Sequence, residues 1–98
     1  MYLKIHKSYR HVVAICDKEL IGKKLEEGKR QLEIREFFFK GNEVSEEECL
    51  RIISLEIMED ATFNIVGQKS INTAIKAGII TSDSISHIQG IPFALTLL

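Results

Sequence analysis

The apolar residues of this chain change their spacing along the sequence, and this change constrains the fold more than any other feature. Residues 2–6 and 11–16 are short, apolar-rich segments typical of strands. Between residues 45 and 78 the apolar residues recur at intervals of three and four, which is helical spacing. Residues 84–88 and 93–98 are again typical of strands. This order of strands, helices and strands favours an α+β domain.

The first two strands are predicted to form a hairpin around a four-residue loop, residues 7–10. If His6 pairs with His11, cross-strand partners share a face, because side chains alternate with a period of two. One face of the hairpin then carries the residues expected in the core, which are Leu3, Ile5, Val12, Ala14 and Cys16. The other face carries Val13 and Ile15, so we expect another segment or another molecule to cover that end.

The next segment is predicted to contain a short turn, a loop and a third strand. Asp17 is placed to cap the turn at residues 18–21, and residues 23–28 are the predicted loop. Residues 30–36 alternate between apolar and polar residues and are the predicted third strand. Phe37, Phe38 and Phe39 follow, and they cannot all face the core of a sheet, because successive strand side chains point to opposite faces. Whether this triplet is core or interface stays open.

Two helices are predicted in the middle of the chain. Ser45 and Glu48 have the spacing of a capping box, in which each side chain binds the backbone N–H of the other. The helix that begins there is expected to reach about residue 60. A second helix is expected to begin between residues 64 and 68 and to end at Gly78, a residue type common at helix ends. The residues just before Gly67 are predicted to be helical rather than extended.

These elements predict a single domain over residues 1–98, with two helices packed on a largely antiparallel sheet. The expected architecture has two layers and the element order β-β-β-α-α-β-β. A chain of 98 residues can bury one modest core. The residues expected in that core are Leu3, Ile5, Val12, Ala14, Leu32, Ile34, Leu50, Ile53, Ile57, Ile71 and Ile75.

Charge is distributed unevenly, although the net charge is only −1. Residues 1–40 carry a net charge of +4, whereas residues 41–60 carry −6. The overall balance excludes a protein that coats nucleic acid through bulk positive charge. It still permits a basic face and an acidic face on one small domain.

The sequence predicts a cytoplasmic protein with reduced cysteines. No apolar segment approaches the roughly 20 residues that span a membrane, and the N-terminus lacks the apolar core of a signal peptide. Cys16 and Cys49 do not belong to a CxxC pattern. We therefore expect both to be packing residues rather than metal ligands or a redox pair.

Four segments of the chain resemble, in order, one family of small archaeal proteins. These segments are residues 1–6, 16–23, 64–78 and 88–92. The most specific is Asn64-Ile65-Val66-Gly67-Gln68-Lys69-Ser70-Ile71, followed by Ala74-Ile75-Lys76-Ala77-Gly78. They are similar to the family catalogued as domain of unknown function 424. The resemblance spans nearly the whole chain and implies an archaeal cytosolic protein, but it implies no activity and no catalytic residue.

No pattern in the sequence predicts catalytic chemistry. Gly67 to Ser70 partly match a phosphate-binding loop, but Gln68 separates the glycine from Lys69 and the upstream glycine is missing. His6 and His11 could share a metal across the hairpin, but a zinc site needs at least three protein ligands. We therefore predict no catalytic residue, no metal site and no cofactor, and we favour a non-enzymatic role.

Binding of RNA or a ribonucleoprotein is the favoured function. The loop at residues 7–10 combines cations with Tyr9, as surfaces that bind single-stranded nucleic acid do. The candidate binding residues are Lys7, Arg10, Lys23, Lys24 and Lys69. The alternative is a protein-interaction module that forms a homo-oligomer through an apolar patch of residues 37–39 with Val13 and Ile15. An enzyme ranks third.

Overall fold

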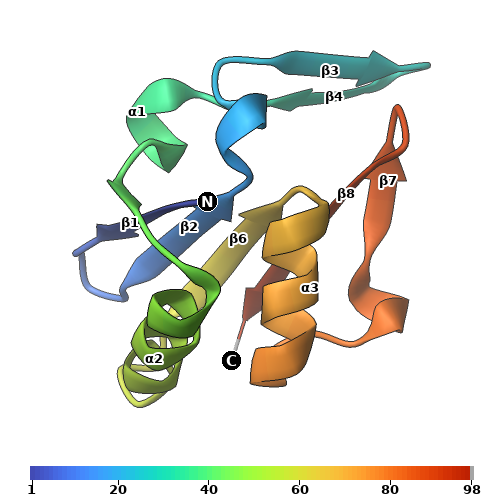
Figure 1. The fold of residues 1–98 in the computed structure, drawn as a ribbon. Coiled ribbons are helices and arrows are strands. Elements are labelled where there is room, and N and C mark those ends of the chain that lie inside the picture. Colours follow the sequence, from blue (N-terminus) through green and yellow to red (C-terminus); the bar gives the residue numbers. More distant parts are fainter. Residues whose placement is uncertain (98) are drawn as a thin grey trace.

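The computed structural model describes residues 1–97, in which a mixed six-stranded sheet is the central element (Figure 1). The strand order is β5-β1-β2-β6-β8-β7. The only parallel neighbours among these strands are β2 and β6, and every other pair is antiparallel. The strands are β1 (Tyr2–His6), β2 (Val12–Cys16), β5 (Asn42–Glu43), β6 (Thr62–Val66), β7 (Ser86–Ile88) and β8 (Ile91–Leu97). The predicted α+β class is confirmed.

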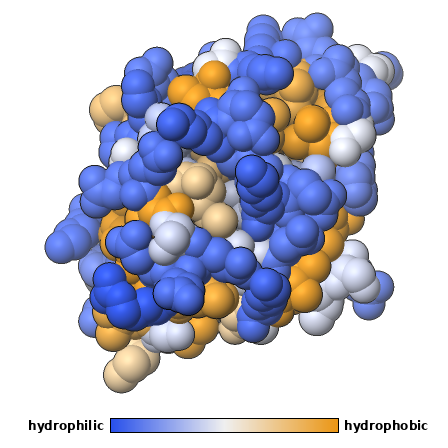
Figure 2. All heavy atoms as spheres, viewed as in Figure 1, coloured by the Kyte–Doolittle hydropathy of each residue, from blue (hydrophilic) through white to orange (hydrophobic). Residues whose placement is uncertain are grey.

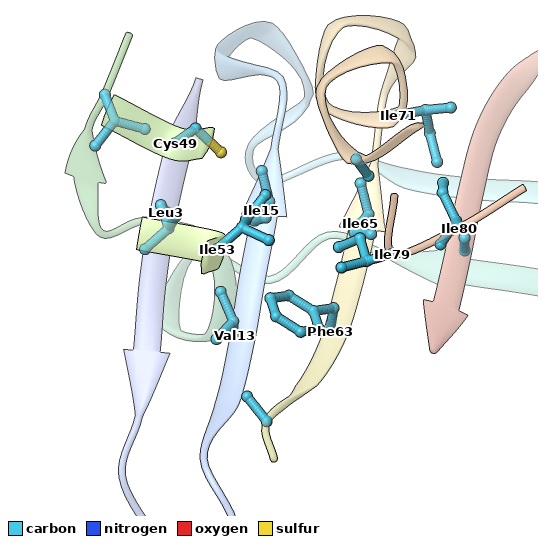
Figure 3. Packing of buried hydrophobic residues seen from close by; sticks show 14 residues of the cluster. Leu3, Val13, Ile15, Cys49, Ile53, Phe63, Ile65, Ile71, Ile79 and Ile80 are labelled. Atoms are coloured by element: carbon cyan, nitrogen blue, oxygen red, sulfur yellow. The ribbon is translucent and has the colours of Figure 1, made fainter. Parts of the chain in front are cut away.

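Two helices, α2 (Glu46–Ile57) and α3 (Gln68–Ala77), cover one face of this sheet (Figure 1). The main core lies between them and the strands, where apolar side chains from both layers point toward one another (Figure 3). The predicted capping box is confirmed, because the Glu48 backbone N–H donates to Ser45 Oγ at 3.1 Å. Gly78 ends α3 in the left-handed conformation, as predicted. Among residues 1–97, none of the helices combines the length and the apolar character needed to span a membrane.

A second group of elements covers part of the opposite face of the sheet. It comprises the 3₁₀ turn η1 (Lys18–Leu20), the hairpin β3 (Lys24–Glu27) and β4 (Arg30–Glu33), and the short helix α1 (Glu36–Phe39). A further 3₁₀ turn, η2 (Ser82–Ser84), precedes β7. The second core is buried between this group and the sheet, and it contains Ala14, Cys16, Leu20, Leu25, Ile34, Phe39, Val66 and Ile88.

The first hairpin forms as predicted, but its register differs by one residue. His6 pairs with Val12 rather than His11, so the connecting segment has five residues, 7–11. A shift of one residue moves every side chain of a strand to the other face. Val13 and Ile15 therefore pack under the helices in the main core, while Ala14 and Cys16 face the second core.

The segment at residues 23–39 differs from its prediction. The predicted loop at 23–28 is wrong, because residues 24–27 form β3, whose Leu25 pairs with Leu32 of β4. Gly28 turns the hairpin with a positive φ of 61°. The predicted third strand is shorter than expected and belongs to this separate two-stranded sheet. The phenylalanine triplet lies in a helix, which directs its three side chains outward in different directions.

The residues just before Gly67 were wrongly predicted to be helical, because residues 62–66 form a strand. This strand is β6, which is largely buried on both faces and lies between β2 and β8. A strand buried on both faces shows a continuous apolar run instead of an alternation, so its pattern resembles that of a buried helix. Ile57 and Ile75 were also wrongly placed in the core, since they are 38% and 43% exposed. Leu98, the end of the predicted strand 93–98, lies outside the described residues.

Candidate nucleic-acid interface

The face of the sheet opposite α2 and α3 is only partly covered. The strand registers place Lys4, Ala14, Asn64 and Leu95 in one row across four neighbouring strands. Leu95 is 64% exposed, and Asn64 is half-buried. The β3–β4 hairpin packs beyond this row, against Cys16 and Val66. Ala14 of β2 is fully buried, so the open strip of this row lies over β6 and β8, at Asn64 and Leu95.

Helix α1 presents an aromatic ring next to a cation of β1. Phe37 is 81% exposed, which is unusual for a phenylalanine. The ammonium nitrogen of Lys4 lies 4.7 Å from the centroid of the Phe37 ring. The same ammonium donates a hydrogen bond to the carbonyl oxygen of Phe37 at 2.6 Å. Lys4 thus holds the exposed ring in place by a cation–π contact and a hydrogen bond.

His6 attaches α1 to β1 and is not a metal ligand in this arrangement. Its ring stacks on Phe38 with the centroids 4.7 Å apart, and its Nε2 lies 2.9 Å from the Phe38 carbonyl oxygen. Because a carbonyl only accepts, Nε2 must carry the hydrogen. Phe38 in turn meets the buried ring of Phe39 edge-on at 5.0 Å. Within residues 1–97, no group of three metal-binding side chains is present.

The turn between β1 and β2 extends from the same end of β1 as His6. Lys7, Tyr9 and Arg10 are all exposed, and Tyr9 is fully so. The Ser8 hydroxyl donates to the Arg10 carbonyl oxygen at 2.6 Å, which fixes the shape of the turn. The ring of His6 lies 6.5 Å from that of Phe37 and so links the turn to α1. We call Lys4, Lys7, Tyr9, Arg10 and Phe37 the turn–α1 surface.

The other predicted binding residues lie elsewhere. Lys23 and Lys24 lie beyond the opposite end of β2, at the start of β3, and the Lys24 ammonium is 3.7 Å from Glu26. Lys69 lies in the first turn of α3, on the helix-covered side of the sheet. Of the five predicted residues, the structure therefore brings together only Lys7 and Arg10.

The acidic residues at the beginning of α2 are separated from the turn–α1 surface. Glu46 and Glu48 lie at the beginning of α2, where Glu46 pairs with Lys76 and Glu48 caps the helix. The turn lies near the other end of α2. There, buried Glu56 accepts a hydrogen bond from His11 Nδ1 at 2.9 Å. Glu59 adds a further carboxylate to the shallow hollow that Lys7 also lines.

The start of α3 has the strand–glycine–helix context of a phosphate-binding loop, but its anion position is occupied. Asp17 does not cap its own turn, contrary to the prediction. Its carboxylate instead accepts hydrogen bonds from the backbone N–H groups of Lys69 and Ser70, at 3.1 and 2.8 Å, and from the Ser70 hydroxyl at 2.8 Å. This carboxylate takes the place that a phosphate would use at a helix start.

Both cysteines are buried and free, as predicted. Burial raises the pKa of Cys16 to about 12 and that of Cys49 to about 11. Because the thiolate is the reactive form of cysteine, these thiols are unreactive at neutral pH.

The apolar patch proposed for self-association does not form as predicted. Val13 and Ile15 are completely buried beneath α2 and α3, so they cannot join residues 37–39 at the surface. Apolar exposure occurs instead at the end of α2, where Met58 is 81% exposed and Leu55 is also exposed.

The sequence reasoning missed Lys4 and Phe37 as surface partners. The signal was present in the phenylalanine triplet, because three adjacent aromatics on a short helix cannot all be buried. The contact between Phe37 and Lys4 depends on the packing of α1 against β1, which the spacing of residues in the sequence does not reveal.

Comparisons with known proteins identify relatives of the chain but no activity. A family model described as "Protein of unknown function (DUF424)" matches residues 6–97. The crystal structure of an uncharacterized conserved protein from Methanopyrus kandleri matches with a TM-score of 0.87 and 26% sequence identity, covering 97% of this chain and 88% of that chain. No curated protein matches the chain. The family resemblance found in the sequence is therefore confirmed.

Proposed function

The chain belongs to the DUF424 family, whose description names no activity, and we propose from its surface that it binds single-stranded RNA, free or within a ribonucleoprotein. In this proposal it is a cytoplasmic, non-enzymatic protein. The RNA lies along the turn–α1 surface and the open strip of sheet over β6 and β8.

One observation carries the proposal, which is the exposed Phe37 ring with a lysine ammonium 4.7 Å from its centroid. The lysine lies over one face of the ring, and an exposure of 81% leaves the other face open to a base. Stacking of a base on an aromatic side chain contributes about 1–3 kcal/mol and tolerates any base. Lys4 also supplies positive charge beside the stacked nucleotide.

The neighbouring residues supply the other contacts that a single strand needs. Lys7 and Arg10 extend from the turn, where long cationic side chains can reach phosphate oxygens. Tyr9 offers a second exposed ring. Asn64, in the open row of the sheet, carries an amide that can bind the edge of an unpaired base.

Fluorescence anisotropy with a labelled ten-nucleotide RNA tests the proposal. We expect binding at about 50 mM salt that weakens steeply as salt rises, because phosphate binding releases counterions. Lys7→Glu with Arg10→Glu should weaken binding about tenfold or more and reduce the salt slope by about 2. Phe37→Ala should weaken binding by about 1–3 kcal/mol and leave the salt slope unchanged.

The matched control is Lys23→Glu with Lys29→Glu, which makes the same change in charge at the other end of the molecule. Equal weakening by the control would mean that net charge alone drives binding, and it would contradict the proposed surface. Absence of RNA retention by the wild-type protein at about 50 mM salt would overturn the proposal.

A homo-oligomer is the second candidate, because Leu55 and Met58 expose apolar area at the end of α2. Apolar association changes little with salt, whereas phosphate binding weakens. Sedimentation of the protein alone at low and high salt separates the two candidates. Met58→Lys should then yield a monomer if self-association uses this region.

A further inference from the structure

A hollow of about 630 Å³ lies between the beginning of α2 and helix α3, on the face opposite the turn–α1 surface. Figure 2 shows this side of the molecule, with a depression surrounded by mostly hydrophilic side chains near the middle of the view. Its volume falls within the range of about 300–1,000 Å³ that is usual for small-molecule sites. None of the residues in the turn–α1 surface lines it, so it can be considered separately.

The hollow has an apolar part. Met1, which precedes β1, Val44, between β5 and α2, and Ile75 of α3 line it. Ile75 is 43% exposed, although its helix packs on the sheet, because no element covers its outer side. An apolar group placed in the hollow would remove this surface from water, which is favourable.

The hollow also carries an excess of positive charge. Lys69 and Lys76 line it from positions two turns apart on α3, and Glu46 is its only carboxylate among the described residues. The Lys76 ammonium lies 2.5 Å from Glu46, so this pair joins α3 to α2. The ammonium of Lys69 has no hydrogen-bond or ion-pair partner within residues 1–97.

We propose that this hollow binds a small organic anion whose charged group meets Lys69 and Lys76 and whose apolar part lies on Ile75 and Val44. Asn72 also lines the hollow, and its oxygen accepts a hydrogen bond from Gln68, so its amide N–H groups can donate to the ligand. A carboxylate and a phosphate ester share the required chemistry, which is negative charge next to an apolar body.

Glu46 competes with the ligand for Lys76. When the anion binds, Lys76 exchanges the Glu46 carboxylate for the charged group of the ligand. Removal of the Glu46 charge should therefore strengthen binding, whereas removal of the Lys69 charge should weaken it. Because general electrostatic attraction would change binding in the same two directions, the distant control Lys29→Gln and the position of the NMR shifts are needed to locate the site at this rim.

Titration of the full chain, followed by backbone amide NMR shifts, tests this proposal. The probes are phenyl phosphate and benzoate. The comparison compounds are inorganic phosphate, which lacks the apolar body, and phenol, which lacks the charge. We expect saturable shifts at residues 44–46 and 69–76, with dissociation constants on the order of millimolar for ligands of this size. Inorganic phosphate and phenol should each bind about tenfold more weakly or not at all.

Variants make the test specific. Lys69→Gln should weaken binding of phenyl phosphate about fivefold, and Glu46→Gln should strengthen it about twofold or more. Lys29→Gln, on the distant β3–β4 turn, is the matched control and should have no effect. Thermal unfolding of each variant confirms that the fold is retained.

Three results would overturn the proposal. The first is an absence of saturable shifts at these residues up to about 20 mM of either anion, since ligands of this size are expected to bind in the millimolar range. The second is equal affinity for phenyl phosphate and inorganic phosphate, which would mean ion binding without a role for the apolar surface. The third is a weakening of binding by Glu46→Gln.

Discussion

The carboxylate of Asp17 caps helix α3 through Ser70, which lies 53 positions further along the chain. The parallel pairing of β2 with β6 makes this contact possible, because it places the end of β2 beside the start of α3. Asp17 is 4% exposed, and its two carboxylate oxygens accept hydrogen bonds from two backbone N–H groups and one hydroxyl. A single buried side chain thus joins the first hairpin to the helical layer.

Asp17→Ala should lower the free energy of unfolding by about 2–3 kcal/mol, because it leaves N–H groups at the start of α3 without an acceptor. Chemical denaturation measures this loss. Asp17→Asn keeps the shape of the side chain and one carbonyl acceptor, so it should cost less than the alanine variant. A loss below about 0.5 kcal/mol for Asp17→Ala would mean that the cap contributes nothing beyond what water supplies.

Gly67 precedes α3 and should not tolerate a side chain, for two separate reasons. Its φ is 107°, which L residues rarely adopt, and an added Cβ would lie 2.3 Å from the Asp17 Cγ. Gly78 also has a positive φ, of 79°, but a Cβ there would meet no atom within 4 Å. Gly78→Ala should therefore cost about 1 kcal/mol from backbone strain alone.

Gly67→Ala should cost clearly more than Gly78→Ala in the same denaturation experiment, because the steric conflict with Asp17 adds to the strain. Equal losses for the two variants would contradict the close approach of Gly67 and Asp17.

The elements that local signals define could be predicted from the sequence, whereas the contacts between distant elements could not. Ser45 and Glu48 lie within one turn of a helix, so their spacing alone identifies the start of α2. The register of β1 and β2 depends on a turn with no strong sequence signal, and a change of one residue exchanged the two faces. The role of Asp17 depends on the β2–β6 pairing, which joins residues about half the length of the chain apart.

In the candidate interface too, locally determined residues could be predicted, whereas contacts between distant segments could not. Lys7 and Arg10 were predicted because a hairpin turn exposes its residues wherever the strands pair. Lys4 and Phe37 lie 33 positions apart, and only the packing of α1 on β1 joins them. Lys69 was predicted as a binding residue next to a partial phosphate-loop pattern, but the structure places the carboxylate of Asp17 at this helix start.

Ionisation of the two cysteine thiols in the unfolded chain should lower the free energy of unfolding at alkaline pH. Burial raises the pKa of Cys16 from 9.0 to about 12 and that of Cys49 from 9.0 to about 11, so the folded protein holds both protons over a range in which the unfolded chain releases them. Stability from these thiols is fully present below pH 9 and falls as the pH rises through the window from 9 toward 11 and 12. The loss approaches about 1.4 kcal/mol per pH unit for each thiol.

Urea denaturation between pH 8 and 11 measures this slope. The double variant Cys16→Ala with Cys49→Ala should start less stable but show a shallower fall with pH. Equal slopes for wild type and variant would show that the thiols ionise in the folded protein as readily as in the unfolded chain. A thiol reagent added at pH 8 should label the native protein far more slowly than the unfolded protein.

The phenylalanine triplet offers a test of both the fold and the proposed RNA surface, because its members have the same side chain in different surroundings. Phe39 is 5% exposed in the second core, so Phe39→Ala should destabilise the protein by about 3–5 kcal/mol. Phe37 is 81% exposed, so Phe37→Ala should change stability by less than about 0.5 kcal/mol while RNA binding falls. Denaturation and RNA anisotropy on the same preparations separate the two effects. A large loss of stability in Phe37→Ala would mean that this ring packs against the protein, and the surface would then lack the exposed aromatic on which the RNA proposal depends.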